Sequence, residues 1–198
     1  MASGRRKNMK VIRKQTIDTE VFELGDEIRF TLTTGEKVRA KAVQKCDKGT
    51  LFITKDCVRK QMPMYKDVSD EHRDYEHSDL RKYLNNELLS LFPERIRSRM
   101  IPMPICDYLR IPTEKEIFNE NTFGEGESYT KRFHGMKHRR NRIAFGHTGS
   151  KDAWWWYWLE NRVPYDDFAE VDYNGNANYG CATRSAGVRV VFELRNGE

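Results

Sequence analysis

An apolar stripe at helical spacing, with strand-like alternation on either side of it, restricts the folds open to this chain. In residues 80–91, large apolar residues recur every three or four positions, which places them on one face of a helix that Ser78 can cap. Residues 22–54 alternate apolar and polar side chains around the turn sequence TTGEK. They predict a β-hairpin followed by a third strand near residues 51–54. The combination predicts an α+β domain with an N-terminal β-hairpin.

The middle of the chain carries several shorter signals. Thr113 and Glu116 have the spacing of a capping box and predict a short helix. We expect another helix in residues 93–101 and a short strand in residues 107–111. Residues 119–150 are polar, basic and punctuated by glycine, which indicates a long surface loop.

The C-terminal part predicts two more strands, residues 168–173 and 188–194, around a turn-rich segment. A chain of 198 residues is long enough for one well-cored domain. We therefore divide the chain into a basic N-terminal tail, residues 1–16, and a single domain, residues 17–198.

The net charge of +5 is unevenly distributed. Residues 1–14 carry six Lys or Arg and no acid, and residues 131–142 carry six more and no acid. The rest of the chain is acidic, with a net charge of −7. A nucleic-acid-associated protein that uses the basic strips 5–14 and 131–142 is therefore one alternative. Neither strip has a stacking platform or a recognition helix beside it, which favours a solvated tail and a solvated loop.

The sequence offers no sign of a membrane span, a metal or a cofactor. It has no apolar run of about 20 residues, and its start, MASGRRKNMK, lacks the apolar core of a signal peptide, so we expect a cytoplasmic protein. The four cysteines show no CxxC spacing and are expected to be reduced thiols. His134 and His138 have no third ligand at motif spacing, so we predict neither a metal site nor a cofactor.

The run of aromatic residues at 154–158 is the most unusual part of the chain. In a strand, Trp154, Trp156 and Trp158 would lie on one face and Trp155 and Tyr157 on the other. One face could then pack in the core while the other contacts a ligand. The alternative is that most of the cluster is core.

A Tyr/Asn/Gly-rich stretch follows, with the composition of adaptable recognition surfaces, where tyrosine anchors and asparagine forms hydrogen bonds. The alternative is that Asn and Gly simply form turns here. We predict a ligand-binding surface made of Trp156, Trp158, Asn161, Asp172, Tyr173, Asn174, Asn176, Asn178, Tyr179, Cys181 and Arg184.

Three motifs together resemble a phage- and prophage-associated domain family of unknown function. Its helix start Ser-x-Leu-Arg-x-x-Leu-Asn is matched here by Ser78, Leu80, Arg81, Leu84 and Asn85. Its tryptophan cluster is matched by Trp154, Trp155 and Trp156. Its closing Gly-Val-Arg strand is matched by Gly187, Val188 and Arg189. The resemblance implies a C-type-lectin-like fold of the formylglycine-generating-enzyme type. The chain departs from the family pattern at residues 158–162, where the family often has Trp-Trp-Leu-Arg-Ser, and at Val190, where a proline often stands.

The C-terminal part also resembles the variable proteins of diversity-generating retroelements, in which mutagenesis of AAY codons varies a ligand-binding surface. The residue types that such codons reach occur at Asp172, Tyr173, Asn174, Asn176, Asn178, Tyr179 and Cys181. This resemblance implies a non-enzymatic display domain of phage or prophage origin, cytoplasmic or virion-associated, with a protein or cell-surface ligand. The sequence leaves its oligomeric state open.

We expect no enzymatic activity. Cysteine and copper chemistry of the formylglycine-generating type needs a late cysteine pair, and Cys181 is the only cysteine after residue 106. The Arg-Gly-Gly-Ser-Trp type signature of those enzymes is absent, as are Gly-x-Ser-x-Gly, Walker and HExxH motifs. The Glu-Pro-Asn and Gln-Pro-Asp loops of calcium-dependent lectins are absent too, so we expect no calcium-dependent sugar binding.

Overall fold

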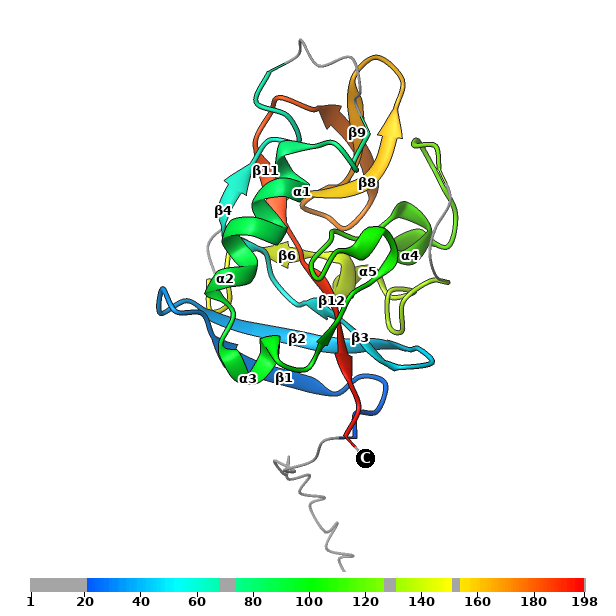
Figure 1. Ribbon diagram of the computed structural model, residues 1–198. Coiled ribbons are helices and arrows are strands. Elements are labelled where there is room, and N and C mark those ends of the chain that lie inside the picture. Colours follow the sequence, from blue (N-terminus) through cyan, green and yellow to red (C-terminus); the bar gives the residue numbers. More distant parts are fainter. Residues whose placement is uncertain (1–20, 68–73, 127–130, 151–153, 198) are drawn as a thin grey trace, which may run out of the picture.

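Two five-stranded sheets form the framework of the protein in a computed structural model, which describes residues 21–67, 74–126, 131–150 and 154–197. The first sheet is antiparallel and has the strand order β1-β2-β3-β12-β5. It occupies the lower half of Figure 1. Its strands are β1 (Glu27–Thr31), β2 (Lys37–Lys45), β3 (Gly49–Thr54), β5 (Met100–Ile101) and β12 (Val191–Arg195).

The second sheet has the order β10-β9-β8-β11-β4 and lies in the upper half of Figure 1. All its pairs are antiparallel except β8 with β11. A separate ribbon pairs β6 with β7. These strands are β4 (Val58–Met62), β6 (Ala144–Phe145), β7 (Trp154–Trp155), β8 (Tyr157–Val163), β9 (Asp167–Val171), β10 (Ala177–Cys181) and β11 (Ala186–Val188).

The chain crosses from the second sheet to the first between β11 and β12, at Arg189 and Val190. In Figure 1 this crossing is the red segment that runs down the middle of the molecule. Val190 donates its N–H to the hydroxyl of Thr54 (3.0 Å) and accepts from the Thr54 N–H (2.9 Å). The Gly-Val-Arg segment therefore joins the two sheets.

The helices are short, and both predicted caps are present. Ser78 accepts a hydrogen bond from the Arg81 N–H (3.0 Å). Thr113 and Glu116 form the reciprocal capping box, with distances of 2.9 and 3.2 Å. The helical elements are α1 (Asp79–Tyr83), the π-helical η1 (Leu84–Leu88), α2 (Leu89–Leu91), α3 (Glu94–Arg97), the 3₁₀ turn η2 (Pro104–Cys106), α4 (Glu114–Phe118) and α5 (Arg139–Arg142).

The buried apolar residues form two clusters. One contains the α1–α2 stripe together with the rings of Phe30, Phe52 and Phe192 from the first sheet and Phe92 at the end of α2, whose neighbouring centroids lie 5.1–6.2 Å apart. The other contains Phe133, Met136 and one face of β8 and β9, whose opposite face, with Trp158 and Phe168, belongs to the first cluster. The predicted stripe is thus confirmed as core, with Leu80 and Leu84 fully buried.

Asn85 explains why an asparagine ends the helix-start motif. Its side-chain oxygen accepts from the N–H groups of Tyr108 and Leu109 (both 3.0 Å), and its amide donates to the Leu109 carbonyl (2.8 Å). One turn earlier, Arg81 contacts both carboxylate oxygens of Asp107 at 2.6 and 2.9 Å. The side chains of Asn85 and Arg81 therefore hold residues 107–109 against the helix.

Three segments differ from the sequence prediction. The helix expected in residues 93–101 stops at Arg97, because Met100 and Ile101 pair with β12 instead. The strand expected in residues 107–111 reduces to one bridge between Arg110 and Val191, because side chains of the helix take up the neighbouring backbone groups. β10 was predicted only as part of a turn-rich segment.

The long loop expected at residues 119–150 is also partly wrong. It contains α5 and β6, and its Phe133 and Met136 are buried in an apolar cluster that takes residues from both sheets. Of the two basic strips, residues 5–14 lie outside the described residues. In the other strip Arg142 is half-buried and donates to the carbonyl of Gly175 (2.8 Å), so this arginine holds structure together.

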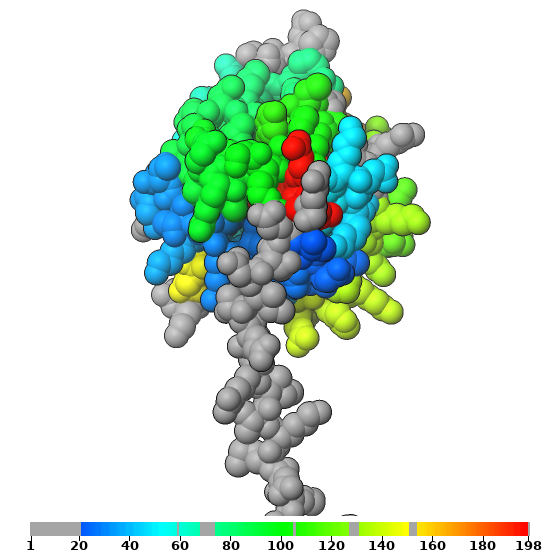
Figure 2. Space-filling view, turned by 60° about the horizontal axis from the view of Figure 1, so that its bottom comes forward, coloured from blue at the N-terminus to red at the C-terminus, as the bar shows by residue number. Residues whose placement is uncertain are grey.

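The first and last described segments lie side by side. Arg99 stacks over the ring of Phe22 at 5.1 Å and donates to the carbonyl of Arg195 at 2.8 Å. Figure 2 shows blue and red atoms meeting on this face. Within the described residues, the longest apolar helical stretch falls short of what crossing a bilayer requires.

Candidate ligand-binding surface

Glu170 on β9 and Arg184, just before β11, form an ion pair in the second sheet. Glu170 is buried and Arg184 is half-exposed. Gly180, on the neighbouring strand β10, leaves space for the ion pair. A Cβ atom on Gly180 would lie 2.7 Å from Arg184 Nη2 and 2.8 Å from Glu170 Oε1. The absence of a side chain at Gly180 is therefore what lets the guanidinium reach the carboxylate.

Burial raises the pKa of Glu170 to about 7, even though Arg184 acts in the opposite direction. The second carboxylate oxygen has no hydrogen-bond partner and is buried. Losing hydration costs the charged form more than one partly exposed arginine returns. A carboxyl group that titrates near neutral pH thus lies directly beneath the surface.

Trp156 is partly exposed and contacts two exposed side chains. Arg184 stacks over its ring at 5.2 Å, and the ring of Tyr173 lies 6.0 Å from it. Arg184 also covers the inner Trp158 at 5.7 Å. One arginine therefore bridges a buried carboxylate, a core tryptophan and a surface tryptophan.

A second aromatic pair lies at β10, on the opposite side of that strand from the Arg184–Glu170 ion pair. Tyr179 contacts Phe123 with ring centroids 5.1 Å apart, and both rings are at least 40% exposed. β10 is an edge strand of the second sheet. We define the aromatic surface as Trp156, Tyr173, Tyr179, Phe123 and Arg184.

The turn that carries Tyr173 is internally braced. The carboxylate of Asp172 accepts from the N–H groups of Asn174 (2.8 Å) and Asn176 (2.7 Å). Gly175 adopts a positive φ of 80°, and a Cβ there would lie 2.8 Å from the Arg139 carbonyl. Asp172 therefore fixes the conformation of the turn, and Gly175 allows the turn to pack closely against Arg139, while Tyr173 remains exposed.

Two predicted ligand-binding residues lie in the interior, so their assignment to the surface is corrected. Trp158 is fully buried and donates its indole N–H to the Met62 carbonyl at 2.7 Å. Asn161 is 4% exposed and accepts from the Glu114 N–H at 2.7 Å. Both side chains are oriented inward by backbone partners far away in the sequence.

The predicted alternation along residues 154–158 is also corrected. β7 ends at Trp155 and β8 begins at Tyr157, so the run is two strands joined at Trp156. Trp154 is 54% exposed, whereas Tyr157 and Trp158 are both buried. The alternating pattern fails because Trp154 and Trp155 pair with β6, outside the second sheet.

The other predicted residues lie where a partner could reach them. Asp172, Asn174 and Asn178 are partly exposed, and Tyr173, Asn176, Tyr179, Cys181 and Arg184 are exposed. Asn178 uses its side-chain oxygen to accept from the next N–H, that of Tyr179 (2.9 Å). Cys181 contacts the hydroxyl of Thr183 (3.3 Å).

Sequence reasoning missed Phe123 and Glu170 in this region, and the exposed Tyr165 outside it. Phe123 comes from the segment that we had predicted to be a loop, and Glu170 reads in the sequence as an ordinary strand residue. Tyr165, at the tip of the β8–β9 hairpin, is 95% exposed with φ 66°. The sequence Pro-Tyr-Asp-Asp between two apolar runs was the available sign of this turn.

Fold and surface together define an α+β, sheet-rich domain with an exposed aromatic surface at one sheet edge. A family described as a domain of unknown function (DUF6273) matches residues 48–196, and the chain belongs to this family. The matched range contains the whole aromatic surface. No curated protein and no solved structure matches the chain.

Proposed function

We propose that this protein is a non-enzymatic binding domain that presents the aromatic surface to a protein or cell-surface ligand. The observation that carries the proposal is the environment of Trp156, which lies between Tyr173 and Arg184 while the charge of Arg184 is held by Glu170. Tyrosine, tryptophan and arginine are enriched among the residues that dominate binding energetics, and the two aromatic types bury large areas with only two rotatable side-chain bonds.

The aromatic surface is also partly pre-ordered, which lowers the entropic cost of binding. The Asp172 turn fixes the position of Tyr173, and the salt bridge fixes Arg184. The amide oxygen and N–H groups of the exposed asparagines around it can adapt to different polar ligands. A rigid aromatic centre with an adaptable polar margin suits recognition of a large, structured partner.

A finer proposal concerns origin. We infer that the domain is a C-type-lectin-like display protein of phage or prophage origin, related to the variable proteins of diversity-generating retroelements. In its support, all seven positions of AAY-reachable type have at least partial exposure. The bracing role of Asp172 argues that this position varies less than its neighbours.

The binding proposal can be tested with the labelled full-length chain and a panel of intact bacterial cells and purified envelope fractions. We expect saturable binding to at least one member, abolished in a Trp156→Ala/Tyr173→Ser variant. A matched control is Trp154→Ala/Tyr165→Ser, which removes the same residue types from exposed sites outside the aromatic surface. Equal loss in both variants, or no saturable binding at all, would contradict the proposal.

The origin is tested separately, by sequencing the encoding locus. A reverse transcriptase gene and a near-copy of the codons for residues 154–195 that differs only at adenines would support the display proposal. If both are absent, the domain is a fixed binder, and the aromatic-surface proposal is unaffected.

A further inference from the structure

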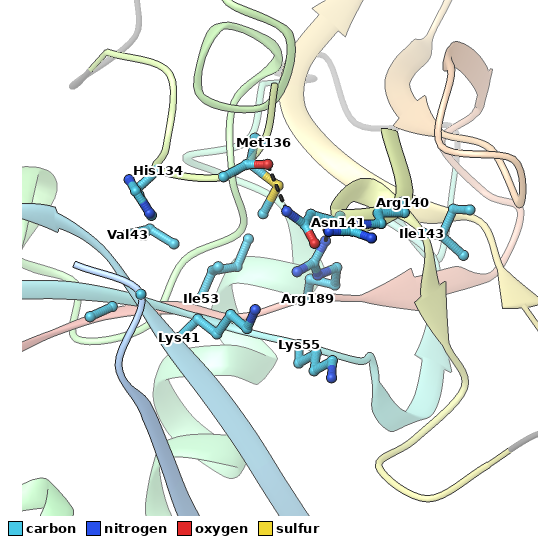
Figure 3. Close-up of a pocket in the computed structure, with 13 residues that line it drawn as sticks. Lys41, Val43, Ile53, Lys55, His134, Met136, Arg140, Asn141, Ile143 and Arg189 are labelled. Atoms are coloured by element: carbon cyan, nitrogen blue, oxygen red, sulfur yellow. Dashed lines mark hydrogen bonds between the residues drawn. The ribbon is translucent and has the colours of Figure 1, made fainter. Parts of the chain in front are cut away.

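A cavity lies between strands β2 and β3 and the segment of residues 134–143 (Figure 3), and its chemistry differs from that of the aromatic surface. Its volume is about 140 Å³, comparable with the roughly 150 Å³ of an engineered cavity that holds benzene. No Asp or Glu is present among the described residues that line it. The lining includes the basic residues Lys41, Lys55, His134, Arg140 and Arg189.

Arg189 is the most informative of these residues. It is 2% exposed, and it donates through Nε to the Thr54 carbonyl (2.9 Å) and through Nη1 to the Tyr157 hydroxyl (3.1 Å) and the Asn141 carbonyl (3.3 Å). All these acceptors are uncharged. Within the described part of the chain, no carboxylate forms an ion pair with it. A buried charge is costly unless it is paired, so this guanidinium calls for an anion.

The opposite wall adds further positive charge. Lys41 projects from β2, and Lys55 follows the last residue of β3 (Figure 3). Partial burial lowers the pKa of Lys55, and the positive charges of Arg39 and Lys41 act in the same direction. Glu27 and Asp56 oppose this effect, but neither lines the cavity. Glu27 is the cross-strand partner of Lys41 on β1, but the two lysines, unlike Glu27, line the cavity and lie within electrostatic range of each other.

The remaining walls are apolar and come from Val43, Ile53, Met136 and Ile143. An inorganic ion alone would leave these walls without contacts, whereas an organic group attached to an anion would cover them. Four permanently basic side chains exceed what one carboxylate neutralises. A phosphate monoester carries about 1.5 to 2 negative charges near pH 7, and Arg189 Nη2, which takes part in none of the three hydrogen bonds above, can donate to its oxygens.

We propose that this cavity binds a small organic phosphate, with its phosphoryl group held by Arg189, Lys41 and Lys55 and its organic part against the apolar walls. The site is separate from the aromatic surface and does not depend on the function proposed for it. Because Arg189 is part of the Gly-Val-Arg segment that joins the two sheets, bound phosphate would also strengthen that junction.

Titration calorimetry of the full-length chain with phenyl phosphate and inorganic phosphate, at constant ionic strength set by sodium chloride, tests the proposal. We expect saturable binding, tighter for phenyl phosphate. Lys41→Gln and Lys55→Gln should each weaken it about ten-fold or more, because a hydrogen bond to a charged group is lost. Lys37→Gln is the matched control: it makes the same change at an exposed end of β2, outside the cavity, and should leave affinity unchanged.

Melting temperatures of the three variants establish that each is folded. Absence of saturable binding by the wild-type chain would overturn the proposal, as would equal weakening by Lys37→Gln. If benzoate bound as tightly as phenyl phosphate, the phosphate assignment would be overturned and the site would be assigned to a carboxylate. Binding of a single-stranded oligonucleotide with steep salt dependence, and of neither small phosphate, would instead assign the basic residues to nucleic acid.

Discussion

The guanidinium of Arg184 reaches the carboxylate of Glu170 across Gly180, so a residue at the surface neutralises one that is fully buried. The charge of Glu170 inside the sheet therefore depends on the position of Arg184 in the aromatic surface. Any ligand that draws Arg184 away leaves Glu170 without its partner.

The first prediction concerns the dependence of stability on pH. The pKa of Glu170 is raised from 4.5 to about 7 in the folded protein, so the folded state holds this proton longer than the unfolded state does. Its contribution to the free energy of unfolding is therefore full below about pH 4.5 and is lost as the pH rises through about 7. Glu170→Gln imitates the protonated form and should remove this loss.

Urea denaturation of the wild type and of Glu170→Gln at pH 5, 6, 7 and 8 measures the effect. The variant should gain stability relative to the wild type as the pH rises. Glu120→Gln, the same carboxylate-to-amide change at an exposed position outside both sheets, is the control. A difference between Glu170→Gln and wild type that is constant with pH, or that reverses sign, would show that Glu170 does not titrate in this range.

The second prediction concerns Asn85, which satisfies three backbone groups of residues 108–109. Asn85→Ala leaves these groups without their partner and should lower the free energy of unfolding by about 1–3 kcal/mol. Asn86→Ala changes the same residue type at the exposed neighbouring position and should stay within about 0.5 kcal/mol of wild type. Equal effects of both changes in denaturant titrations would rule out the bracing role.

The third prediction separates surface from core. Replacing Asn174, Asn176 and Tyr179 together with alanine should change the melting temperature little, because these side chains are partly or fully exposed. Leu84→Ala should cost about 2–5 kcal/mol, because Leu84 is fully buried in the first apolar cluster. Calorimetry that found the triple variant unfolded and Leu84→Ala unaffected would invert this division.

The fourth prediction concerns the four free cysteines. Burial raises the pKa of Cys57 to about 12 and that of Cys46 to about 11, which disfavours the reactive thiolate in both. Cys106 and Cys181 are exposed. Iodoacetamide followed by peptide mass spectrometry should modify these two first and Cys57 last. Early modification of Cys57 in the folded protein would contradict its buried position.

Ligand binding at the aromatic surface should slow the modification of Cys181 and leave that of Cys106 unchanged. Cys181 ends β10 two residues after Tyr179, whereas Cys106 lies in η2. The ratio of the two rates thus reports on binding with an internal control.

Local patterns were enough to predict much of the fold. The hairpin of β1 and β2, the helix capped by Ser78 and the capping box of Thr113 are all confirmed, because each depends on residues within a few positions of one another. The C-type-lectin-like assignment rests on resemblance and stays a proposal.

The aromatic run shows where local patterns stop being sufficient. Trp156 and Trp158 look alike in the sequence, yet one contributes to the surface and the other is fully buried. The difference arises from Met62, nearly a hundred residues earlier, whose carbonyl accepts the indole N–H of Trp158. Asn161 was misassigned for the same reason, since its partner Glu114 lies on another element.

Neighbours along the chain were therefore sufficient to predict the hairpin, the capped helices and the presence of an aromatic run near residue 156. The contacts between the two sheets establish which aromatic residues face outward, how Arg184 reaches Glu170, and that Lys41, Lys55 and Arg189 line one cavity. The difference comes from how far apart in the sequence the interacting residues lie. Periodicity and capping are set by neighbours along the chain, whereas burial and charge pairing are set by elements that meet only when the two sheets are joined.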